Sequence, residues 1–322
     1  MSKNRVFLTR RLHEFALKEL RKRYSIKVHS GKIPIPREKL IKKIANVDGL
    51  ICFPYDKIDK EVIDAAKNLR AISTYSVGYD HIDINYAKKR GIRIGYTPDV
   101  LTDATADLAI ALMVDLLRRV TEGDRIIRRG DWKVIYGAYD YVGVDISKKT
   151  LGIVGLGRIG RVVSQRAKAF GMNVLYYNRN RLSKSVEQKL GVKYSTLNSL
   201  FSKSDVVSLH VPHNPQTNEM VNLPLLKKMK KESYIINTAR GKIIKESDLI
   251  FALKKKIIAG AALDVFTNEP IDSKNPLLKL ENVVLAPHIG SSTVETRAKM
   301  AEITVENLNR GIAGKKPIYS VK

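Results

Sequence analysis

The sequence predicts an α/β protein with two doubly wound parallel-sheet domains, the second inserted into the first. Three observations support this fold class. The first hundred residues alternate short apolar runs with amphipathic segments, and a second, cleaner series of the same kind begins at Leu151. At 322 residues the chain also exceeds the usual size of a single hydrophobic core. Such alternation is typical of parallel sheets with helices on both faces.

In the first series, apolar runs predict strands and the amphipathic segments between them predict helices. The predicted strands are 6–8, 25–28, 49–53, 71–75 and 92–94, and the predicted helices lie near 11–23 and 40–45. A long helix is expected from about Thr102 to Val120, and its apolar residues nearly all round the middle indicate a buried helix. Residues 121–150, rich in Gly, Tyr and Asp, are expected to form an extended arm or loop around Trp132.

The second series supplies the inserted domain. Its predicted strands are 151–154, 173–177, 206–211, 234–237, 259–263 and 283–285, with helices at 158–170 and 246–254. A final helix, near 292–309, is expected to return to the first domain. We therefore expect a substrate domain formed by residues 1–98 and 288–322, with a flavodoxin-like fold, and a dinucleotide-binding domain of Rossmann type over residues 99–287.

Composition excludes several classes of protein. The formal charge is +26, but the lysines and arginines are scattered and no nucleic-acid-binding motif is present, so we expect no nucleic-acid partner. No apolar run reaches the roughly 20 residues of a membrane span, and we read no secretory signal, which favours a cytoplasmic protein. Cys52 is the only cysteine and the six histidines lack metal-ligand spacing, so no metal site is expected. Scarce glutamine beside abundant lysine resembles a thermophile's composition.

A glycine fingerprint indicates a dinucleotide site. It follows a predicted strand and opens a helix, which is the context that makes such a motif informative. The first glycine permits a tight turn, the second allows the pyrophosphate to approach the backbone, and the third allows helix and strand to pack closely. Amides at the start of the helix would then bind the phosphates. The residues are Gly155, Leu156, Gly157, Arg158, Ile159 and Gly160.

The end of the second strand of this domain decides which cofactor is preferred. An NAD enzyme carries Asp or Glu there to bind the ribose hydroxyls. This chain has Asn178, Arg179, Asn180 and Arg181 instead. Guanidinium groups suit a 2′-phosphate, so the sequence predicts NADP(H), with NAD(H) as a second cofactor. In the alternative interpretation these arginines are solvated and selectivity is slight.

Three polar residues downstream suit the reduction of a 2-oxo acid. Arg240 could bind the substrate carboxylate through two parallel hydrogen bonds. His288 could protonate the carbonyl oxygen as hydride arrives, and Glu269 could keep that imidazole charged. Taken singly, each residue would more often form a surface ion pair or a structural contact.

The chain resembles the D-isomer-specific 2-hydroxyacid dehydrogenases, and within them the glyoxylate/hydroxypyruvate reductases, over residues 45–310. The motifs that carry the resemblance are Ser-Val-Gly-Tyr-Asp-His-Ile-Asp at 76–83, Leu-Thr-Asp-Ala-Thr-Ala-Asp at 101–107, the glycine fingerprint, His-Val-Pro at 210–212, Asn-Thr-Ala-Arg-Gly at 237–241, residues 264–270 and Pro-His-Ile-Gly at 287–290. The resemblance implies that the amides of Val77 and Gly78 hold the substrate carboxylate. It also implies further cofactor contacts at Thr105, Val211, Pro212, Thr238, Ala239, Asp264 and Gly290, beside Arg240 and His288.

The substrate side chain is expected to face Phe53 and Tyr55. Neither binds a phosphate, which favours a small unphosphorylated acid such as glyoxylate or hydroxypyruvate. The resemblance and the buried helix also imply a homodimer. Two alternatives stay open: a D-2-hydroxyacid dehydrogenase for larger 2-oxo acids, and an NAD(H)-sensing corepressor that binds peptides.

Overall fold

The computed structural model describes residues 3–31 and 34–321. The chain divides into two compact units, Met1–Leu101 with Ser291–Lys322, and Thr102–Gly290. Each unit contains one parallel sheet, so the predicted α/β fold class is confirmed. The unit boundaries lie a few residues further along the chain than expected, and His288 therefore belongs to the second unit.

The first unit surrounds a parallel sheet covered by helices. Its strands are β1 (Arg5–Leu8), β2 (Ser25–Val28), β3 (Gly49–Cys52), β4 (Ala71–Thr74) and β5 (Arg93–Gly95), and its earlier helices are α1 (Glu14–Arg23), α2 (Arg37–Ile44), α3 (Lys60–Ala65) and α4 (Ile84–Lys89). The strand order is β2-β1-β3-β4-β5, which is the flavodoxin-like order. Strands β3 and β4 are buried along their whole length, as a sheet covered on both faces requires.

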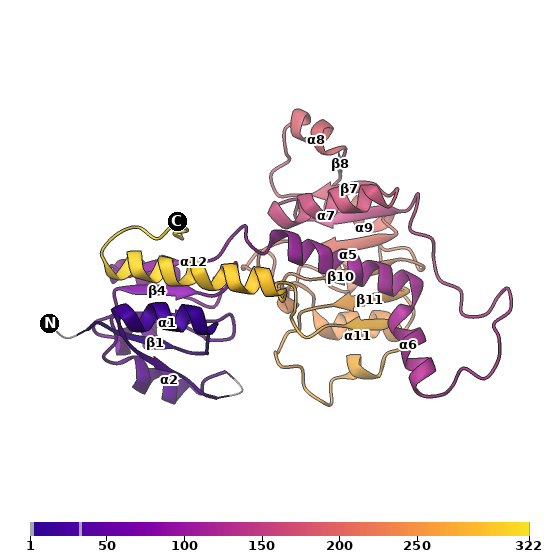
Figure 1. The fold of residues 1–322 in the computed structure, drawn as a ribbon. Coiled ribbons are helices and arrows are strands. Elements are labelled where there is room, and N and C mark those ends of the chain that lie inside the picture. The colour runs from indigo at the N-terminus through magenta and orange to yellow at the C-terminus, as the bar shows by residue number, and fades with distance from the viewer. Residues whose placement is uncertain (1–2, 32–33, 322) are drawn as a thin grey trace. The chain divides into compact units, whose positions relative to one another are not determined.

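The final helix, α12 (Val294–Ile312), packs beside β4 in the first unit (Figure 1). Ser73 Oγ donates a hydrogen bond to Thr304 O at 2.8 Å, and Asn307 Nδ2 donates to Tyr96 O at 2.9 Å. The helix is thus fixed to the sheet by polar bonds as well as apolar contacts. The sequence prediction that the last helix returns to the first unit is confirmed.

The second unit is a longer series of strands and helices. Its strands are β6 (Thr150–Val154), β7 (Asn173–Tyr177), β8 (Lys193–Tyr194), β9 (Val206–Leu209), β10 (Tyr234–Asn237), β11 (Gly260–Leu263) and β12 (Val283–Leu285). Its helices are α5 (Thr102–Arg118), α6 (Val120–Arg128), α7 (Arg158–Ala169), α8 (Lys184–Leu190), α9 (Leu197–Lys203), α10 (Leu223–Leu226) and α11 (Glu246–Lys254), with short 3₁₀ turns at Gly241–Ile243 and Pro276–Lys279. The order β12-β11-β10-β9-β6-β7-β8 is the Rossmann order extended by one strand.

Both faces of this second sheet are buried. Two consecutive residues of β10 illustrate this. Ile235 packs on one face in a cluster with α9, α10 and α11, and Ile236 packs on the other face in a cluster with α5 and α7. Side chains of a strand point alternately to its two faces, so a strand buried on both sides is apolar throughout. This explains the continuous apolar runs of the second series.

The segment after α5 corrects the sequence prediction of an arm over 121–150. Residues Val120–Arg128 form α6, and only 129–149 lack helix and strand. Figure 1 shows α6 and this loop standing out from the second unit. No residue of α6 is buried, so the core of the second unit does not hold this helix in place. An ion pair between Asp124 and Arg128, four residues apart, supports it instead.

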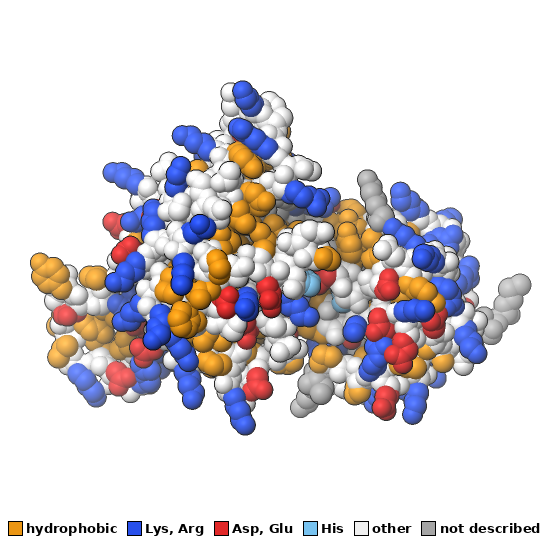
Figure 2. All heavy atoms as spheres, turned by 180° about the vertical axis from the view of Figure 1, so that it is seen from behind, with side chains coloured by type: hydrophobic (Ala, Val, Ile, Leu, Met, Phe, Trp, Pro, Cys, Tyr) orange, Lys and Arg blue, Asp and Glu red, His pale blue; other side chains and the backbone are white. Residues whose placement is uncertain are grey.

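Two further properties bear on the kind of protein. In the described ranges, we find no helix with the length and apolar character needed to span a membrane. Figure 2 shows lysine and arginine side chains spread over the face in view, with acidic groups among them. On that face the lysines and arginines are scattered rather than gathered in one patch, in line with their scatter along the sequence.

Candidate active site

The glycine fingerprint forms the turn between β6 and α7, beside the point where the strand order of the second sheet reverses. Gly155 has a φ of 98°, and a Cβ placed on it would lie 2.7 Å from the carbonyl oxygen of His210. A Cβ on Gly160 would lie 2.3 Å from Gly155 O. A Cβ on Gly157, in contrast, would meet no atom within 4 Å. The first and third glycines are therefore required by packing, while the second faces open space.

The end of β7 carries the residues predicted to select the cofactor. Asn178 Oδ1 accepts a hydrogen bond from the amide of Leu156 at 2.7 Å, so this side chain holds the fingerprint loop. The Arg181 guanidinium donates two hydrogen bonds to Glu187, both of 2.8 Å, and holds the pKa of that carboxyl far below its usual range. Arg179 is exposed. Arg181 is therefore held by an ion pair, whereas Arg179 is exposed to solvent.

The Arg181–Glu187 pair could not be predicted from the sequence. Tyr176 OH also donates to Glu187 Oε1, at 2.6 Å, and the Arg181 guanidinium lies 5.2 Å from the centre of the Tyr194 ring. These partners come from strand β7, helix α8 and strand β8, which no local motif connects. Only the fold brings them together.

Arg240 occupies a turn that its own motif builds. Asn237 Oδ1 accepts from the amide of Ala239 at 3.0 Å, and Asn237 Nδ2 donates to Arg240 O at 2.9 Å. A Cβ on Gly241 would lie 1.9 Å from the carbonyl carbon of Phe266, so only glycine fits there. The loop that carries Arg240 therefore lies directly against the loop that leads to Glu269.

Glu269 and His288 form a close pair. Glu269 Oε2 lies 2.6 Å from His288 Nδ1, and Glu269 Oε1 accepts from the amide of Phe266 at 2.9 Å. The side chains are 16% and 24% exposed, so the pair is shielded but within reach of a ligand. A carboxylate on Nδ1 fixes the ring orientation and stabilises the imidazolium.

Asp264 anchors the backbone that follows His288. Its two carboxylate oxygens accept from the amides of Ile289 and Gly290 at 2.7 and 2.9 Å. Burial raises the pKa of Asp264 to about 6, although both amides and His288 favour the charged form. His288 itself has a φ of 55°, a conformation that costs energy for a residue with a side chain. The anchor holds the imidazole in a backbone conformation it would otherwise avoid.

The other predicted contacts lie partly in the second unit and partly in the first. Thr105 lies beside Gly290, since a Cβ there would be 3.3 Å from its methyl carbon. Thr238 is buried, and its hydroxyl has no hydrogen-bond partner within the described part of the chain. Val77, Gly78, Phe53 and Tyr55 belong to the first unit. Of these, Phe53 packs its ring 5.0 Å from that of Tyr75.

His210 differs from His288 in its surroundings. Its Nε2 lies 2.8 Å from Ser208 Oγ, and burial lowers its pKa to about 4. It is therefore neutral at neutral pH and unsuited to supply a proton. Its backbone carbonyl lies so close to Gly155 that a Cβ there would be 2.7 Å from the oxygen.

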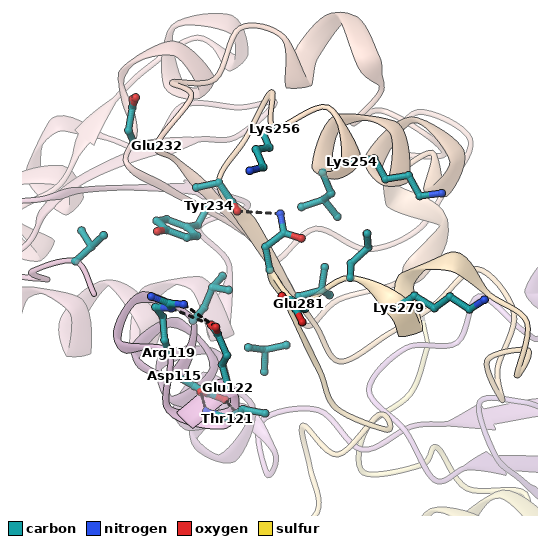
Figure 3. A pocket seen from close by; sticks show the side chains of 18 of the residues that line it. Asp115, Arg119, Thr121, Glu122, Glu232, Tyr234, Lys254, Lys256, Lys279 and Glu281 are labelled. Atoms are coloured by element: carbon teal, nitrogen blue, oxygen red, sulfur yellow. Dashed lines mark hydrogen bonds and ion pairs between the residues drawn. The ribbon is translucent and has the colours of Figure 1, made fainter. Parts of the chain in front are cut away.

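A hollow of about 870 Å³ lies elsewhere on the second unit (Figure 3). Residues of α5 and α6 line one side of it, where Arg119 and Glu122 form an ion pair, and the starts of β10 and β12 line the other. The fingerprint and His288, in contrast, follow the carboxyl ends of β6 and β12. The hollow contains none of the predicted cofactor or catalytic residues.

Comparison with known proteins agrees with this geometry. A family model described as the D-isomer specific 2-hydroxyacid dehydrogenase, NAD binding domain, matches residues 110–290. A glyoxylate reductase of Thermofilum pendens is 45% identical over 318 residues, covering 98% of this chain and 94% of its own length. The chain therefore belongs to the D-isomer-specific 2-hydroxyacid dehydrogenases, in the branch that contains the glyoxylate reductases.

Solved structures share the whole fold. The TT0316 protein of Thermus thermophilus is 43% identical with a TM-score of 0.92, covering 99% of this chain and all of its own. An NADPH-dependent glyoxylate/hydroxypyruvate reductase of Sinorhizobium meliloti, in complex with NADP and malonate, is 31% identical with a TM-score of 0.87, at 99% and 97% coverage. The first establishes the fold over essentially the full chain, and the second is a relative solved with a nicotinamide cofactor.

Proposed function

We propose that the protein reduces glyoxylate or hydroxypyruvate to the corresponding 2-hydroxy acid, with NADPH as the preferred cofactor. The observation that carries this proposal is the 2.6 Å contact between Glu269 Oε2 and His288 Nδ1 in a partly buried setting. An imidazole held in this way is a general acid for a carbonyl oxygen. The names of the relatives support the substrate class.

Each residue of the triad has a distinct task in this reaction. Arg240 binds the carboxylate of the 2-oxo acid and so orients its carbonyl group. His288 donates a proton from Nε2 to the carbonyl oxygen, because Nδ1 is engaged by Glu269. Glu269 stabilises the charged imidazole before the transfer and fixes its ring. The reduced nicotinamide, when bound, supplies the hydride that the carbonyl carbon accepts.

The residues of the second unit fit a dinucleotide. Gly157 opens onto free space at the start of α7, where backbone amides can bind a pyrophosphate. The buried hydroxyl of Thr238 lacks a hydrogen-bond partner among the described residues and follows the carboxyl end of β10. A bound nicotinamide ring carries polar groups that would satisfy it. Thr105, Asp264 and Gly290 complete this end of the proposed cofactor site.

The preference for NADPH rests on the end of β7. No carboxylate occupies positions 178–181 to repel a 2′-phosphate, and Arg179 is exposed there. Arg181 is held by Glu187, so Arg179 is assigned the main contact with the phosphate. The NADPH-dependent relative from Sinorhizobium meliloti is consistent with this assignment.

The first unit is assigned the remaining substrate contacts. The amides of Val77 and Gly78 bind the carboxylate, while Phe53 and Tyr55 face the substrate's remaining atoms. Lys57, the cation nearest in sequence, is strongly exposed and lies 3.6 Å from Asp59. The guanidinium of Arg10 lies 5.7 Å from the centre of the Tyr55 ring, but residues 53–59 contain no arginine of their own, which favours a small unphosphorylated acid.

We also propose that the protein is a homodimer. Between Val120 and Val142, eight large apolar side chains are exposed, among them Trp132, Ile135 and Tyr139. Apolar groups gathered on one projecting segment are typical of an interface. Light scattering should therefore give about twice the mass of the 36.2 kDa chain; a monomer at micromolar concentration would contradict this assignment.

The direct test follows absorbance of the reduced nicotinamide with glyoxylate or hydroxypyruvate, each with NADPH and with NADH. We expect rapid oxidation of NADPH with at least one acid and slower oxidation of NADH. Activity with NADH alone would contradict the cofactor preference. Activity only with larger 2-oxo acids would indicate a broader D-2-hydroxyacid dehydrogenase. No turnover with any 2-oxo acid would favour a corepressor-like binding protein.

A further inference from the structure

A chain of buried hydroxyl groups joins His81 to the turn that contains Val77 and Gly78. His81 Nε2 lies 3.0 Å from Thr74 Oγ1, which lies 2.7 Å from Ser76 Oγ. Ser76 Oγ in turn donates to Gly78 O at 2.6 Å. Thr74 and Ser76 are 0% and 5% exposed, so water does not compete for these bonds. Each group therefore depends on its neighbour for a partner.

The chain has a fixed direction because each hydroxyl has a single hydrogen. Ser76 uses its hydrogen on Gly78 O, which can only accept. Thr74 must then donate to Ser76, and His81 must donate to Thr74. His81 therefore carries a hydrogen on Nε2. A residue without a donor at this place would leave Thr74 Oγ1 with only the weak hydrogen bond to the Cys52 thiol besides Ser76, and would allow the hydroxyl groups to turn.

Backbone bonds hold both ends of the chain. His81 O accepts from the amide of Ile58 at 2.8 Å, which fixes the imidazole's own backbone. Ser76 O accepts from the amide of Thr97 at 2.9 Å. The thiol of Cys52 lies 3.9 Å from His81 Nε2, and burial raises its pKa, so it brings no charge to the chain. The hydroxyl groups are thus the adjustable part of an otherwise rigid frame.

The bond from Ser76 Oγ to Gly78 O closes a ring that contains the peptide groups of Val77 and Gly78. We propose that His81 is a positioning residue, which acts through Thr74 and Ser76 to hold these two amides in place for the substrate carboxylate. This inference rests on the proposed function, which assigns the amides that task. It gives His81 a role beyond packing, although His81 does not touch the substrate.

Strand β4 offers a matched control. Ser73 is also fully buried and donates to Thr304 O at 2.8 Å, but it lies outside the chain. Removing its hydroxyl costs one buried hydrogen bond of the same kind on the same strand. If S73A and a Thr74 variant change the KM for the 2-oxo acid equally, the cause is a general loss of stability. Only a difference between the two variants shows that the turn containing Val77 and Gly78 has been disturbed.

The experiment measures kcat and both KM values of T74V, T74S, H81L, H81Q and S73A, together with their Tm. We expect T74V and H81L to raise the KM for the 2-oxo acid about tenfold, as for loss of one hydrogen bond, with the KM for NADPH unchanged. T74S and H81Q keep an oxygen or a donor at the same place and should restore most of the loss. S73A should lower Tm like T74V while leaving the 2-oxo acid KM unchanged.

The outcomes separate this proposal from the proposed function. If T74V and S73A change the 2-oxo acid KM equally, or if H81L has no effect, the positioning role is overturned while reductase activity stands. If the wild type oxidises no reduced cofactor, the proposed function fails instead. Nitrogen-15 NMR of His81 is an independent check that needs no turnover: a hydrogen on Nε2 supports the chain, and its absence overturns it.

Discussion

Two regions of the second unit serve the proposed reaction, the loop after β12 and the carboxyl end of β7, and they differ in how their charged side chains are held. At the loop after β12, Glu269 engages His288 Nδ1, and Asp264 accepts from the two amides that follow. At the end of β7, Arg181 is bound by Glu187 while Arg179 is exposed. In the proposed function the first region supplies the proton, and the second offers Arg179 to the cofactor. If both assignments hold, proton transfer depends on a rigid site and cofactor choice on an available charge.

The largest effect should come from breaking the rigid region. We expect H288Q to lower kcat by about 10²- to 10⁴-fold, because the general acid is lost. H13Q replaces an imidazole at the start of α1, in the first unit, and serves as the control. Steady-state rates with NADPH and glyoxylate check this. A kcat of H288Q close to that of H13Q would remove His288 from the mechanism.

Asp264, which anchors the backbone after His288, should make the free energy of unfolding depend on pH. Burial raises the pKa of Asp264 to about 6 from an ordinary 3.8, so the folded state binds more protons between these values. The free energy of unfolding must then fall as pH rises through this window. Between these pH values, the free energy of unfolding of the wild type should fall by up to about 3 kcal/mol relative to that of D264N. Urea unfolding from about pH 4 to about pH 7 tests it, and a constant difference would contradict it.

At the second region, R179S should weaken NADPH selectively. Loss of one guanidinium–phosphate contact predicts an increase of about tenfold or more in the KM for NADPH. The KM for NADH is the internal control, because NADH has no 2′-phosphate. Equal changes for both cofactors would show that Arg179 does not read the phosphate.

A smaller effect of opposite sign is expected from E187Q. The uncharged side chain binds Arg181 less firmly, which makes a second guanidinium available at the end of β7. We expect the KM for NADPH to fall by about two- to fivefold, with NADH unaffected. An increase instead would mean that the pair supports the site only by holding Arg181 in place.

Features built by neighbouring residues could be predicted from the sequence, whereas features built by distant residues could not. The fingerprint and the Asn237–Gly241 turn can be predicted because their own residues build their geometry, through Gly155, Gly160 and the Asn237 side chain. The Arg181–Glu187 pair has no such local signal, since it needs β7 and α8 in their folded positions. Helix α6 was missed because the Gly, Tyr and Asp content of the wider segment 121–150 indicated a loop.

In the proposed mechanism, Glu269 holds His288 through Nδ1 while Nε2 donates a proton to the 2-oxo acid. The most direct measurement is the pH dependence of kcat for reduction of glyoxylate by wild type and by E269Q, with NADPH saturating. Without the carboxylate the imidazolium is less stable. We therefore expect the rate of E269Q to fall at lower pH than that of wild type. Profiles of the same shape, differing only in height, would contradict it.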